Sequence, residues 1–365
     1  MRTMRAVVLA DDGPLRVEEV QLDGPEAGEV LVKITACGVC HSDLHMINWS
    51  RQAGVPAPSI FGHEASGVVE EVGEHVHTVK PGDHVVMAFK PTCGKCFYCV
   101  RSMPQLCERP DNRDRSARGK RPRLTMGGKP VNQGVGVGGF AEYTVMPEGG
   151  VIKLRDDAPL DKVCLVGCAV TTGVGAVTSA ARVEAGTPVA VIGIGGVGLN
   201  VVQGARLAGA RHVIAIDTLE SKLELAREFG ATHTIHAERE DPVARAKEIT
   251  AGYLDYAFEA IGLGKTVEQA FEMIRPGGIA VSLGINTDKI TIPGTALLQE
   301  KKLIGSMYGS VSVKQAIPRF VDLYMNGQIK LDELISKRRG FDEANEAFED
   351  MKSGAVARSV LDPKL

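Results

Sequence analysis

Residues 1 to about 150 carry their apolar positions in short runs that either alternate with polar residues or continue unbroken. Three such runs are MRAVVLA at 4–10, GEVLVKITACGV at 28–39 and GVVEEVG at 67–73, and Gly, Pro or Asp residues bound them. Short runs with a period of two are typical of β-strands. The pattern therefore predicts a small β-barrel or β-sandwich for this part of the chain.

Residues 170–305 follow a different pattern, in which strand-like and helix-like segments alternate. The apolar runs are PVAVIGIG, HVIAIDT, LDYAFEAIG and GGIAVSLGI, and helical stretches such as SKLELAREFG lie between them. This alternation predicts βαβ units and a parallel sheet. In the tail, VKQAIPRFVDLYMNGQI and FDEANEAFEDMKSG predict two amphipathic helices, with Gly327 and Gly354 as their C-terminal stops.

The composition is that of an ordinary globular protein. The chain has 365 residues, of which 44% are hydrophobic and 24% charged, and its net charge is −3. This length favours two domains. The charge favours neither a nucleic-acid partner nor a membrane surface. The apolar run at the N-terminus is too short for a signal peptide, and no uncharged apolar run reaches the ~18 residues of a spanning helix. We therefore expect a cytoplasmic protein.

One segment departs from this average composition. Residues 101–130 contain nine Lys or Arg residues against three acidic residues, with few apolar positions. The pattern predicts an exposed loop or lobe. It is either a solvated surface or a basic rim that helps to capture an anionic substrate or partner.

Half of the cysteines fall in the segment CGKCFYCVRSMPQLC. Cys93, Cys96, Cys99 and Cys107 have the spacing C-x2-C-x2-C-x7-C. Four thiolates can close a tetrahedron around Zn²⁺ and leave no open position, which predicts a structural zinc site. Iron–sulfur clusters also use four cysteines, but their ferredoxin-type spacings differ.

A second metal site is suggested by ligands that lie far apart in the sequence. Cys40, His63 and Cys168 form the Cys₂His set of a catalytic zinc ion with one open coordination position. Asp43 could accept the second N–H of the ligand histidine, and Glu64 could assist ligand exchange beside the metal. Spacing alone does not show that these residues meet. His63 could be a core histidine, and Asp43 and Glu64 could be ordinary ion-pair partners.

The segment VAVIGIGGVGLNVVQGARLAGA contains a G-x-G-x-x-G motif between an apolar strand and a helix. In a dinucleotide site Gly193 allows the tight turn, Gly195 lets the backbone approach the pyrophosphate, and Gly198 lets the helix pack closely on the strand. The N-terminus of the helix binds the phosphates.

The next strand ends in Asp217, which lies 19 residues after Gly198. A carboxylate at this position accepts hydrogen bonds from the ribose hydroxyls and repels a 2′-phosphate, which favours NAD over NADP. Lys222 could also reach the ribose or could be a solvated surface lysine.

Taken together, these motifs resemble the zinc-dependent alcohol dehydrogenases of the medium-chain dehydrogenase/reductase family. GHEASGVVEEVG is similar to the zinc signature of that family, and GVCHSDLH, the cysteine quartet, GCAVTTG and GIGGVG follow in the family's order. The resemblance implies an α/β protein with a GroES-like, β-rich catalytic domain and a Rossmann coenzyme domain built on a doubly wound parallel sheet. The catalytic domain would comprise residues 1–169 and 308–365, and the coenzyme domain residues 170–307.

The resemblance also implies the roles of individual residues. Those of the catalytic site are Cys40, Ser42, His45, His63, Glu64 and Cys168. Those that bind the cofactor are His41, Thr172, Gly193, Gly195, Gly196, Val197, Gly198, Asp217 and Lys222. Ser42, Trp49 and Phe89 would line the substrate pocket, although both aromatic residues could instead be plain packing residues. His41 would lie near the pyrophosphate and Thr172 near the nicotinamide.

The implied reaction is the reversible oxidation of a primary or secondary alcohol by hydride transfer to NAD, with two zinc ions in each subunit. Ser42, the cofactor ribose and His45 would carry the proton to solvent. FAEYTVMPEG and neighbouring stretches are similar to the nitrosoaniline-dependent branch. The alternatives are a thiol-adduct formaldehyde dehydrogenase, a polyol dehydrogenase, or a non-catalytic NAD-binding sensor or structural relative. The family implies a homo-oligomer, either a dimer or a tetramer, and a small-molecule alcohol or aldehyde as the substrate.

Overall fold

The computed structural model describes residues 1–55, 57–108, 122–252 and 254–365. The chain divides into two compact units. The catalytic unit comprises Met1–Cys168, Ser312–Met325 and Leu331–Leu365, and the coenzyme unit comprises Ala169–Val311 and Asn326–Lys330.

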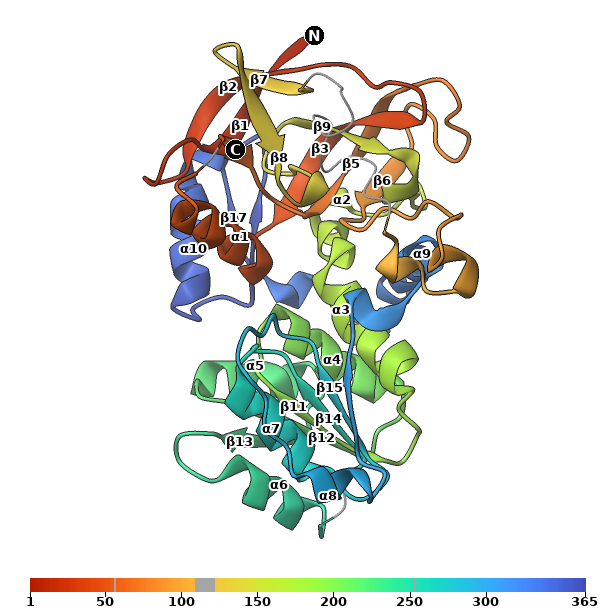
Figure 1. Cartoon of the computed structure of the whole chain (residues 1–365), viewed down its shortest axis with the longest axis vertical. Coiled ribbons are helices and arrows are strands. Elements are labelled where there is room, and N and C mark those ends of the chain that lie inside the picture. Colours follow the sequence, from red (N-terminus) through yellow and green to blue (C-terminus); the bar gives the residue numbers. More distant parts are fainter. Residues whose placement is uncertain (56, 109–121, 253) are drawn as a thin grey trace. The chain divides into compact units, whose positions relative to one another are not determined.

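The catalytic unit is built on a closed barrel and a second, seven-stranded sheet (Figure 1). The barrel strands, in the order β1-β2-β7-β8-β4, are β1 Arg2–Leu9, β2 Arg16–Leu22, β7 Leu124–Met126, β8 Lys129–Gln133 and β4 Ser59–Ile60. The sheet has the order β10-β6-β5-β3-β18-β17, and β9 pairs with β3. Its strands are β3 Glu29–Gly38, β5 Glu64–Val72, β6 His84–Met87, β9 Tyr143–Pro147, β10 Val151–Lys153, β17 Ile335–Arg339 and β18 Arg358–Leu361. The three N-terminal strands predicted from the sequence are confirmed.

Helices in this unit are short, and the two longest described ones follow β3 and open the tail. The α-helices are α1 His41–Gln52, α2 Leu160–Val163, α9 Val313–Met325 and α10 Ala344–Lys352. The 3₁₀ turns are Cys99–Arg101, Pro104–Leu106, Gly134–Gly136, Glu148–Gly150, Cys164–Gly167, Asp332–Leu334 and Phe341–Glu343. Both tail helices predicted from the sequence are confirmed. Gly327 and Gly354 follow them with φ of 69° and 73°, a backbone conformation that ends helices and favours glycine.

The coenzyme unit contains a parallel sheet of six strands in the order β13-β12-β11-β14-β15-β16. The strands are β11 Pro188–Ile192, β12 His212–Asp217, β13 His233–His236, β14 Tyr256–Glu259, β15 Ile279–Ser282 and β16 Lys302–Gly305. The helical segments are α3 Ala169–Gly175, the π-helix Ala176–Ala181, α4 Gly196–Leu207, α5 Glu220–Glu228, α6 Pro242–Ile249, α7 Gly264–Met273, α8 Gly294–Leu297 and the 3₁₀ turn Tyr308–Ser310. The strand order reverses between β11 and β14, where such sheets bind their ligands. The predicted doubly wound sheet is confirmed.

The residues of β11 and of the start of α6 show why these two elements form. All residues of β11 are buried, as expected of a parallel strand that is covered on both faces. At the start of α6 the Asp241 carboxylate accepts hydrogen bonds from the backbone amides of Val243 and Ala244, and Pro242 occupies the first helical position. This combination satisfies amides that have no partner within the helix.

The basic segment 101–130, predicted to be exposed, contains a buried residue towards its C-terminal end. Residues 109–121 lie outside the described residues. Arg123, which the sequence placed in an exposed segment, is buried, and its guanidinium lies 2.6 Å from the Glu29 carboxylate. A guanidinium is tolerated inside a protein when it is paired and hydrogen-bonded, and Arg123 also donates to the carbonyl of Gly24. The prediction of exposure was wrong for this residue.

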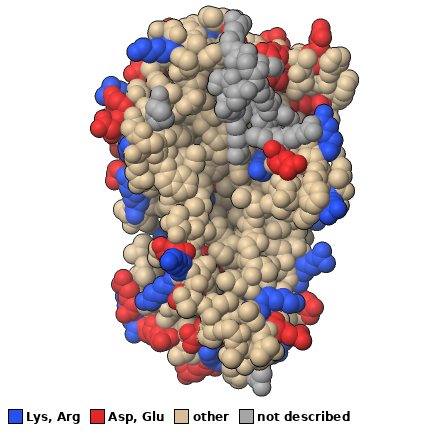
Figure 2. Space-filling view, viewed as in Figure 1, with Lys and Arg blue, Asp and Glu red and all other residues tan. Residues whose placement is uncertain are grey.

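On the face seen in Figure 2, acidic and basic side chains are interspersed rather than gathered by sign.

Within the described ranges, no single helix combines the length and the apolar character that a membrane span needs. One bent pair, Leu160–Gly167 with Ala169–Ala181, meets these criteria together, by length and composition only.

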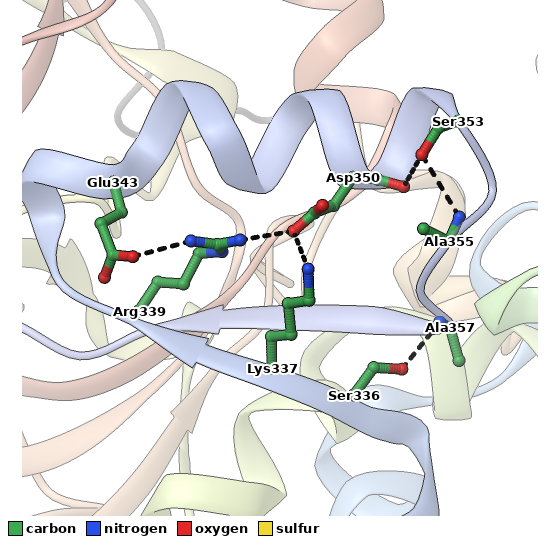
Figure 3. A network of polar contacts seen from close by, with 8 residues as sticks. All are labelled: Ser336, Lys337, Arg339, Glu343, Asp350, Ser353, Ala355 and Ala357. Carbon is green, nitrogen blue, oxygen red and sulfur yellow. Dashed lines mark hydrogen bonds and ion pairs between the residues drawn. The ribbon is translucent and has the colours of Figure 1, made fainter.

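A network of polar contacts joins α10 to β17 (Figure 3). The Asp350 carboxylate accepts hydrogen bonds from Lys337 Nζ at 2.9 Å and from Arg339 Nη2 at 2.6 Å. Arg339 also donates to Glu343. The bonds from Lys337 and Arg339 hold the pKa of Asp350 below its usual value. The network fixes the helix against the strand that lies beside β18.

Asp350→Asn tests the network. The folded pKa of Asp350 is depressed, so its contribution to stability is present above the unfolded value of about 3.9 and is lost as the pH falls through the folded pKa. We expect the variant to unfold at a lower urea concentration than the wild type near pH 7, and the difference to shrink below about pH 4. Urea unfolding followed by circular dichroism measures this. Asp342→Asn, at an exposed carboxylate paired only with Arg5 among the described residues, is the control. A difference that persists unchanged in acid would contradict the prediction.

Candidate active site

Two of the predicted zinc ligands come together through the pairing of β3 with β5. The two strands are antiparallel, and Gly38 lies opposite Glu64. Cys40 follows the end of β3, and His63 immediately precedes β5. Both residues therefore lie just beyond the same end of the ladder, and both are buried.

Cys168 reaches this position from the 3₁₀ turn Cys164–Gly167. A Cβ added to Gly167 would lie 3.6 Å from the Cα of Glu64, so the turn runs close along β5. One ligand atom from each of four buried residues lies within 4.8 Å of the others, namely Cys40, His63, Glu64 and Cys168. Zinc bonds of 2.0–2.3 Å in a tetrahedron separate the ligand atoms by roughly 3.3–3.8 Å. The cluster is thus of a size to hold one zinc ion.

The imidazole of His63 is oriented by Asp43. Its Nδ1 lies 2.9 Å from Asp43 Oδ1, which also accepts a hydrogen bond from the backbone amide of Gly62 at 3.0 Å. Asp43 lies in the first turn of α1. With Nδ1 directed to the carboxylate, Nε2 is the nitrogen left for a metal, the arrangement usual for histidine ligands.

The carboxylate of Glu64 is buried within the cluster. Neither of its oxygens has a hydrogen-bond partner among the described residues. The nearest cation is Arg358 on β18, whose Nε lies 3.5 Å from Glu64 Oε2 and whose Nη2 lies 3.9 Å from Cys40 Sγ. Arg358 is itself buried. A buried carboxylate without a hydrogen bond is costly unless a cation compensates it, so the donor set fits a metal.

Burial and mutual charge shift the acidities of these groups. Burial raises the pKa of Glu64 to about 8, although Arg358 opposes the shift. Burial disfavours the charged form of His63, yet the Asp43 carboxylate raises its pKa. The Cys168 thiol, as a hydrogen-bond donor, lowers the pKa of Cys40, and Arg358 acts in the same direction. The thiolate form of Cys40 is therefore favoured within this cluster.

Helix α1 and the segment after β6 carry further predicted residues, of which Phe89 contacts a member of this cluster. The ring of Phe89 lies 5.4 Å from that of His63, edge to face. Ser42 and His45 are half-buried on α1. Trp49 is 42% exposed, with its ring 6.0 Å from that of His45. His41, the first residue of α1, is exposed.

The four cysteines of the quartet also converge. One ligand atom from each lies within 4.8 Å of the others, and the four are Cys93, Cys96, Cys99 and Cys107. The Sγ atoms of Cys93 and Cys99 are 4.0 Å apart, and those of Cys96 and Cys107 are 3.8 Å apart. These separations are far too long for disulfides and suit a four-thiolate zinc site.

In the coenzyme unit the glycine motif forms the turn from β11 into α4. Gly193 has a φ of 90° and donates a hydrogen bond from its amide to the carbonyl of Ile216. A Cβ on Gly198 would overlap the carbonyl oxygen of Gly193, whereas the space beside Gly195 is open. Gly196 and Val197 form the first residues of α4. The turn therefore leaves room for a ligand at the N-terminus of a twelve-residue helix, the arrangement that binds a pyrophosphate.

Asp217, the last residue of β12, is hydrogen-bonded to the same turn. Its Oδ2 accepts a hydrogen bond from the Ile194 amide at 2.7 Å, and its Oδ1 accepts bonds from Thr218 and Leu219. Lys222 Nζ lies 4.0 Å from Oδ2. The predicted Thr172 is buried in α3. A Cβ added to its neighbour Gly173 would lie 2.6 Å from the carbonyl oxygen of Val197, so this part of α3 runs close to the glycine motif.

Two buried charged residues escaped the sequence analysis. Arg358 stands alone among apolar residues in AVARSVL, and a lone arginine in a strand-like apolar run was the signal that could have found it. Glu259, at the end of β14, is buried and accepts bonds from the amides of Ile261 and Gly262. Its sequence context, DYAFEAIG, likewise places a charge in an apolar run.

Comparisons with known proteins identify the family of the chain. A family model described as "Alcohol dehydrogenase GroES-like domain" matches residues 26–156, and one described as "Zinc-binding dehydrogenase" matches residues 196–325. S-(hydroxymethyl)glutathione dehydrogenase from Paracoccus denitrificans is 39% identical over 99% of this chain and 100% of its own. NDMA-dependent alcohol dehydrogenase from Amycolatopsis methanolica is 40% identical over 99% of each.

The fold is shared equally closely. The crystal structure of benzyl alcohol dehydrogenase from Acinetobacter calcoaceticus matches with a TM-score of 0.92 and 32% identity, covering 99% of both chains. The resemblance stated from the sequence motifs and the fold class that it implied are therefore confirmed. The chain belongs to the zinc-dependent alcohol dehydrogenases of the medium-chain dehydrogenase/reductase family, enzymes that act on CH–OH groups with zinc and NAD as cofactors.

Proposed function

We propose that this chain oxidises a small alcohol to an aldehyde or ketone, and catalyses the reverse reaction, with Cys40, His63 and Cys168 holding the catalytic zinc ion. The observation that carries the proposal is the buried cluster of these residues with Glu64, within 4.8 Å of one another. Zinc bound there supplies a Lewis acid that favours loss of the alcohol proton. Cys93, Cys96, Cys99 and Cys107 hold a second, structural zinc ion.

The chain's own residues orient the metal ligands and move the proton. Asp43 fixes the ring of His63. Arg358 lies beside Cys40 and Glu64 and offsets part of their negative charge. Glu64, whose carboxylate lies in the cluster, would assist the exchange of ligands on the metal. Ser42 and His45, both half-buried and three residues apart on α1, would carry the proton to solvent together with the cofactor ribose.

NAD binds the coenzyme unit at the G-x-G-x-x-G turn. The amides of Gly195, Gly196 and Val197, at the start of α4, would hold the pyrophosphate, and Gly198 keeps the helix close to the strand. Asp217 and Lys222 would hold the adenosine ribose. The Asp217 carboxylate supports a preference for NAD because it repels a 2′-phosphate. His41 and Thr172 remain predicted contacts of the pyrophosphate and the nicotinamide.

Phe89 and Trp49 are the predicted aromatic residues of the substrate pocket, and they guide the proposal of a substrate class within the family. Phe89 places an aromatic edge beside His63, which favours an apolar substituent on the alcohol. The identities of 39% and 40% to a glutathione-adduct enzyme and a nitrosoaniline-dependent enzyme do not separate the two branches. Activity on formaldehyde only in the presence of glutathione would identify the first branch. NADH that remains bound through purification would favour the second.

We also propose that the protein is a homo-oligomer that associates through the coenzyme unit. β16 is the edge strand of the described sheet. The preceding segment exposes Leu297 by 56%, Leu298 by 86% and Ile290 by 39%. An unpaired edge beside exposed apolar side chains is a typical site of association.

The central test of the proposal is His63→Ala. We expect zinc to fall from two ions per chain to one. The turnover number should fall by roughly a thousandfold or more, because a metal Lewis acid contributes several kcal/mol to the rate. Native mass spectrometry measures the zinc, and NADH absorbance measures turnover on a panel of alcohols. His77→Ala, at an exposed histidine of the same unit, is the control. Full zinc content or near-normal turnover in His63→Ala would refute the ligand assignment.

Asp43→Asn tests the orientation of His63. The amide keeps an oxygen for Gly62 but accepts the His63 N–H less strongly, so we expect zinc affinity at this site to fall by roughly 10–100-fold. Competition with a zinc chelator gives the affinity, and the quartet in the same molecule is an internal control. Asp83→Asn removes a buried carboxylate paired with Lys153 elsewhere in the unit and should leave both affinities unchanged. Equal losses in the two variants would argue against a specific role for Asp43.

Leu298→Asp tests the association surface. A charge at this exposed position should lower the mass in solution to that of a smaller assembly, because burying an unpaired carboxylate in an interface is costly. Light scattering after gel filtration measures the mass, and zinc content reports that the chain remains folded. Leu365→Asp, at a residue 63% exposed in the catalytic unit, is the matched control. A wild-type monomer, or an unchanged mass for Leu298→Asp, would contradict the proposal.

A further inference from the structure

The turn that follows β16 has an unusual backbone. Three consecutive residues adopt the left-handed conformation, with φ of 53° at Tyr308, 70° at Gly309 and 54° at Ser310. Residues with a Cβ rarely adopt it, and a bulky residue such as tyrosine does so only under constraint. Tyr308 is also among the most deeply buried large side chains. The surrounding structure must therefore hold this turn in place.

Two features impose the conformation. A Cβ on Gly309 would overlap the carbonyl oxygen of Thr171 on α3, so the turn is pressed against that helix at a position where only glycine fits. The hydroxyls of Ser306 and Ser310 lie 3.1 Å apart and bridge the two ends of the turn. The Ser310 amide also donates to the carbonyl of Met307. The serine pair thus adds a side-chain hydrogen bond that closes the turn.

The turn lies at the edge of the sheet where ligands bind. The strands from β11 to β16 are parallel, so the turn shares the carboxyl edge with the glycine motif and Asp217. Strained backbone persists where its surroundings fix it, and it gathers at ligand clamps. Dinucleotides bind at the carboxyl ends of such strands.

A second observation points to a ligand at the same edge. Each of three neighbouring strands is followed within three residues by an exposed large apolar side chain. Ile261 after β14 is 45% exposed, Ile285 after β15 is 42% exposed, and Met307 in the turn itself is 50% exposed. Exposed apolar residues that gather in this way mark a surface that another group covers. The strained turn thus flanks a surface suited to a flat, largely apolar ring.

We propose that Ser306 and Ser310 are positioning residues for the coenzyme. Their hydroxyl bridge keeps the turn in its left-handed form against α3 and so slows the release of the bound dinucleotide. The inference rests on the proposed function because it takes the ligand of this edge to be NAD(H). Neither serine is required to touch the coenzyme, so chemistry at the zinc site should continue when the bridge is lost.

The test measures NADH release directly. We prepare Ser306→Ala, Ser310→Ala and the double variant with zinc bound, and follow NADH fluorescence in stopped-flow displacement by NAD. We expect each single variant to release NADH about five-fold faster, the factor that corresponds to one neutral hydrogen bond. The double variant should be no faster than either single variant, because the two hydroxyls act as one bridge. Ser306→Thr, which keeps the hydroxyl, should release NADH at the wild-type rate.

Thr187→Ala is the matched control. Its hydroxyl holds a turn through a hydrogen bond to the carbonyl of Glu184 at 2.6 Å, just before β11 and therefore at the opposite edge of the same sheet. It should leave NADH release unchanged. Unchanged release from both serine variants, additive effects in the double variant, or equally fast release from Thr187→Ala would each overturn the inference. Wild-type protein that binds no NADH would instead overturn the proposed function, and the inference with it.

Discussion

The register between β3 and β5 is the constraint on which the catalytic site depends. Gly38 lies opposite Glu64, and a Cβ on Gly38 would crowd both Glu64 Oε2 and the side chain of Leu165. A slip of one residue would turn the side chains of β5 to the other face of the sheet. It would remove Glu64 from the cluster and separate His63 from Cys40. The register shifts in this pairing lie between Leu31 and Val32 and between Ile34 and Ala36, so the pairs from Ala36 to Gly38 remain regular.

The same register creates an electrostatic conflict that a metal resolves. Two thiols and one carboxylic acid, those of Cys40, Cys168 and Glu64, are buried around the guanidinium of Arg358. A second carboxylic acid, Asp43, is buried beside His63. Unpaired buried charge is costly, and burial accordingly raises the pKa of Glu64 to about 8. A divalent cation deprotonates thiol ligands and inverts this balance. Metal binding at this proposed site would therefore be linked to the stability of the catalytic unit, and Arg358 would carry the part of the charge that zinc does not neutralise.

Features encoded in one short segment of the sequence could be predicted, whereas features that depend on residues far apart in the chain could not. The cysteine quartet and the glycine motif each occupy one short segment, so spacing alone identified them, and the strand and helix patterns of both units were recognisable. The convergence of Cys40, His63 and Cys168 depends on strand register, so the residue types suggested the ligand set but spacing could not show that its members meet. Arg358 was missed because it reaches the site through β18, from the far end of the chain. The exposure of Arg123 was predicted wrongly because composition averages over a segment, whereas its pairing with Glu29 is specific.

At the carboxyl edge of the coenzyme sheet, buried carboxylates accept hydrogen bonds from the loops that follow β11 and β14. Both loops contain glycine residues with a positive φ, Gly193 and Gly262. Asp217 and Glu259 end β12 and β14, the two strands that flank β11. Each accepts hydrogen bonds from backbone amides, and Asp217 holds the amide of Ile194 inside the glycine motif. The residue proposed to select NAD therefore also shapes the turn that receives the pyrophosphate. Replacing Asp217 by a small residue to admit a 2′-phosphate would release that amide as well, so coenzyme preference and loop geometry cannot be changed independently at this position.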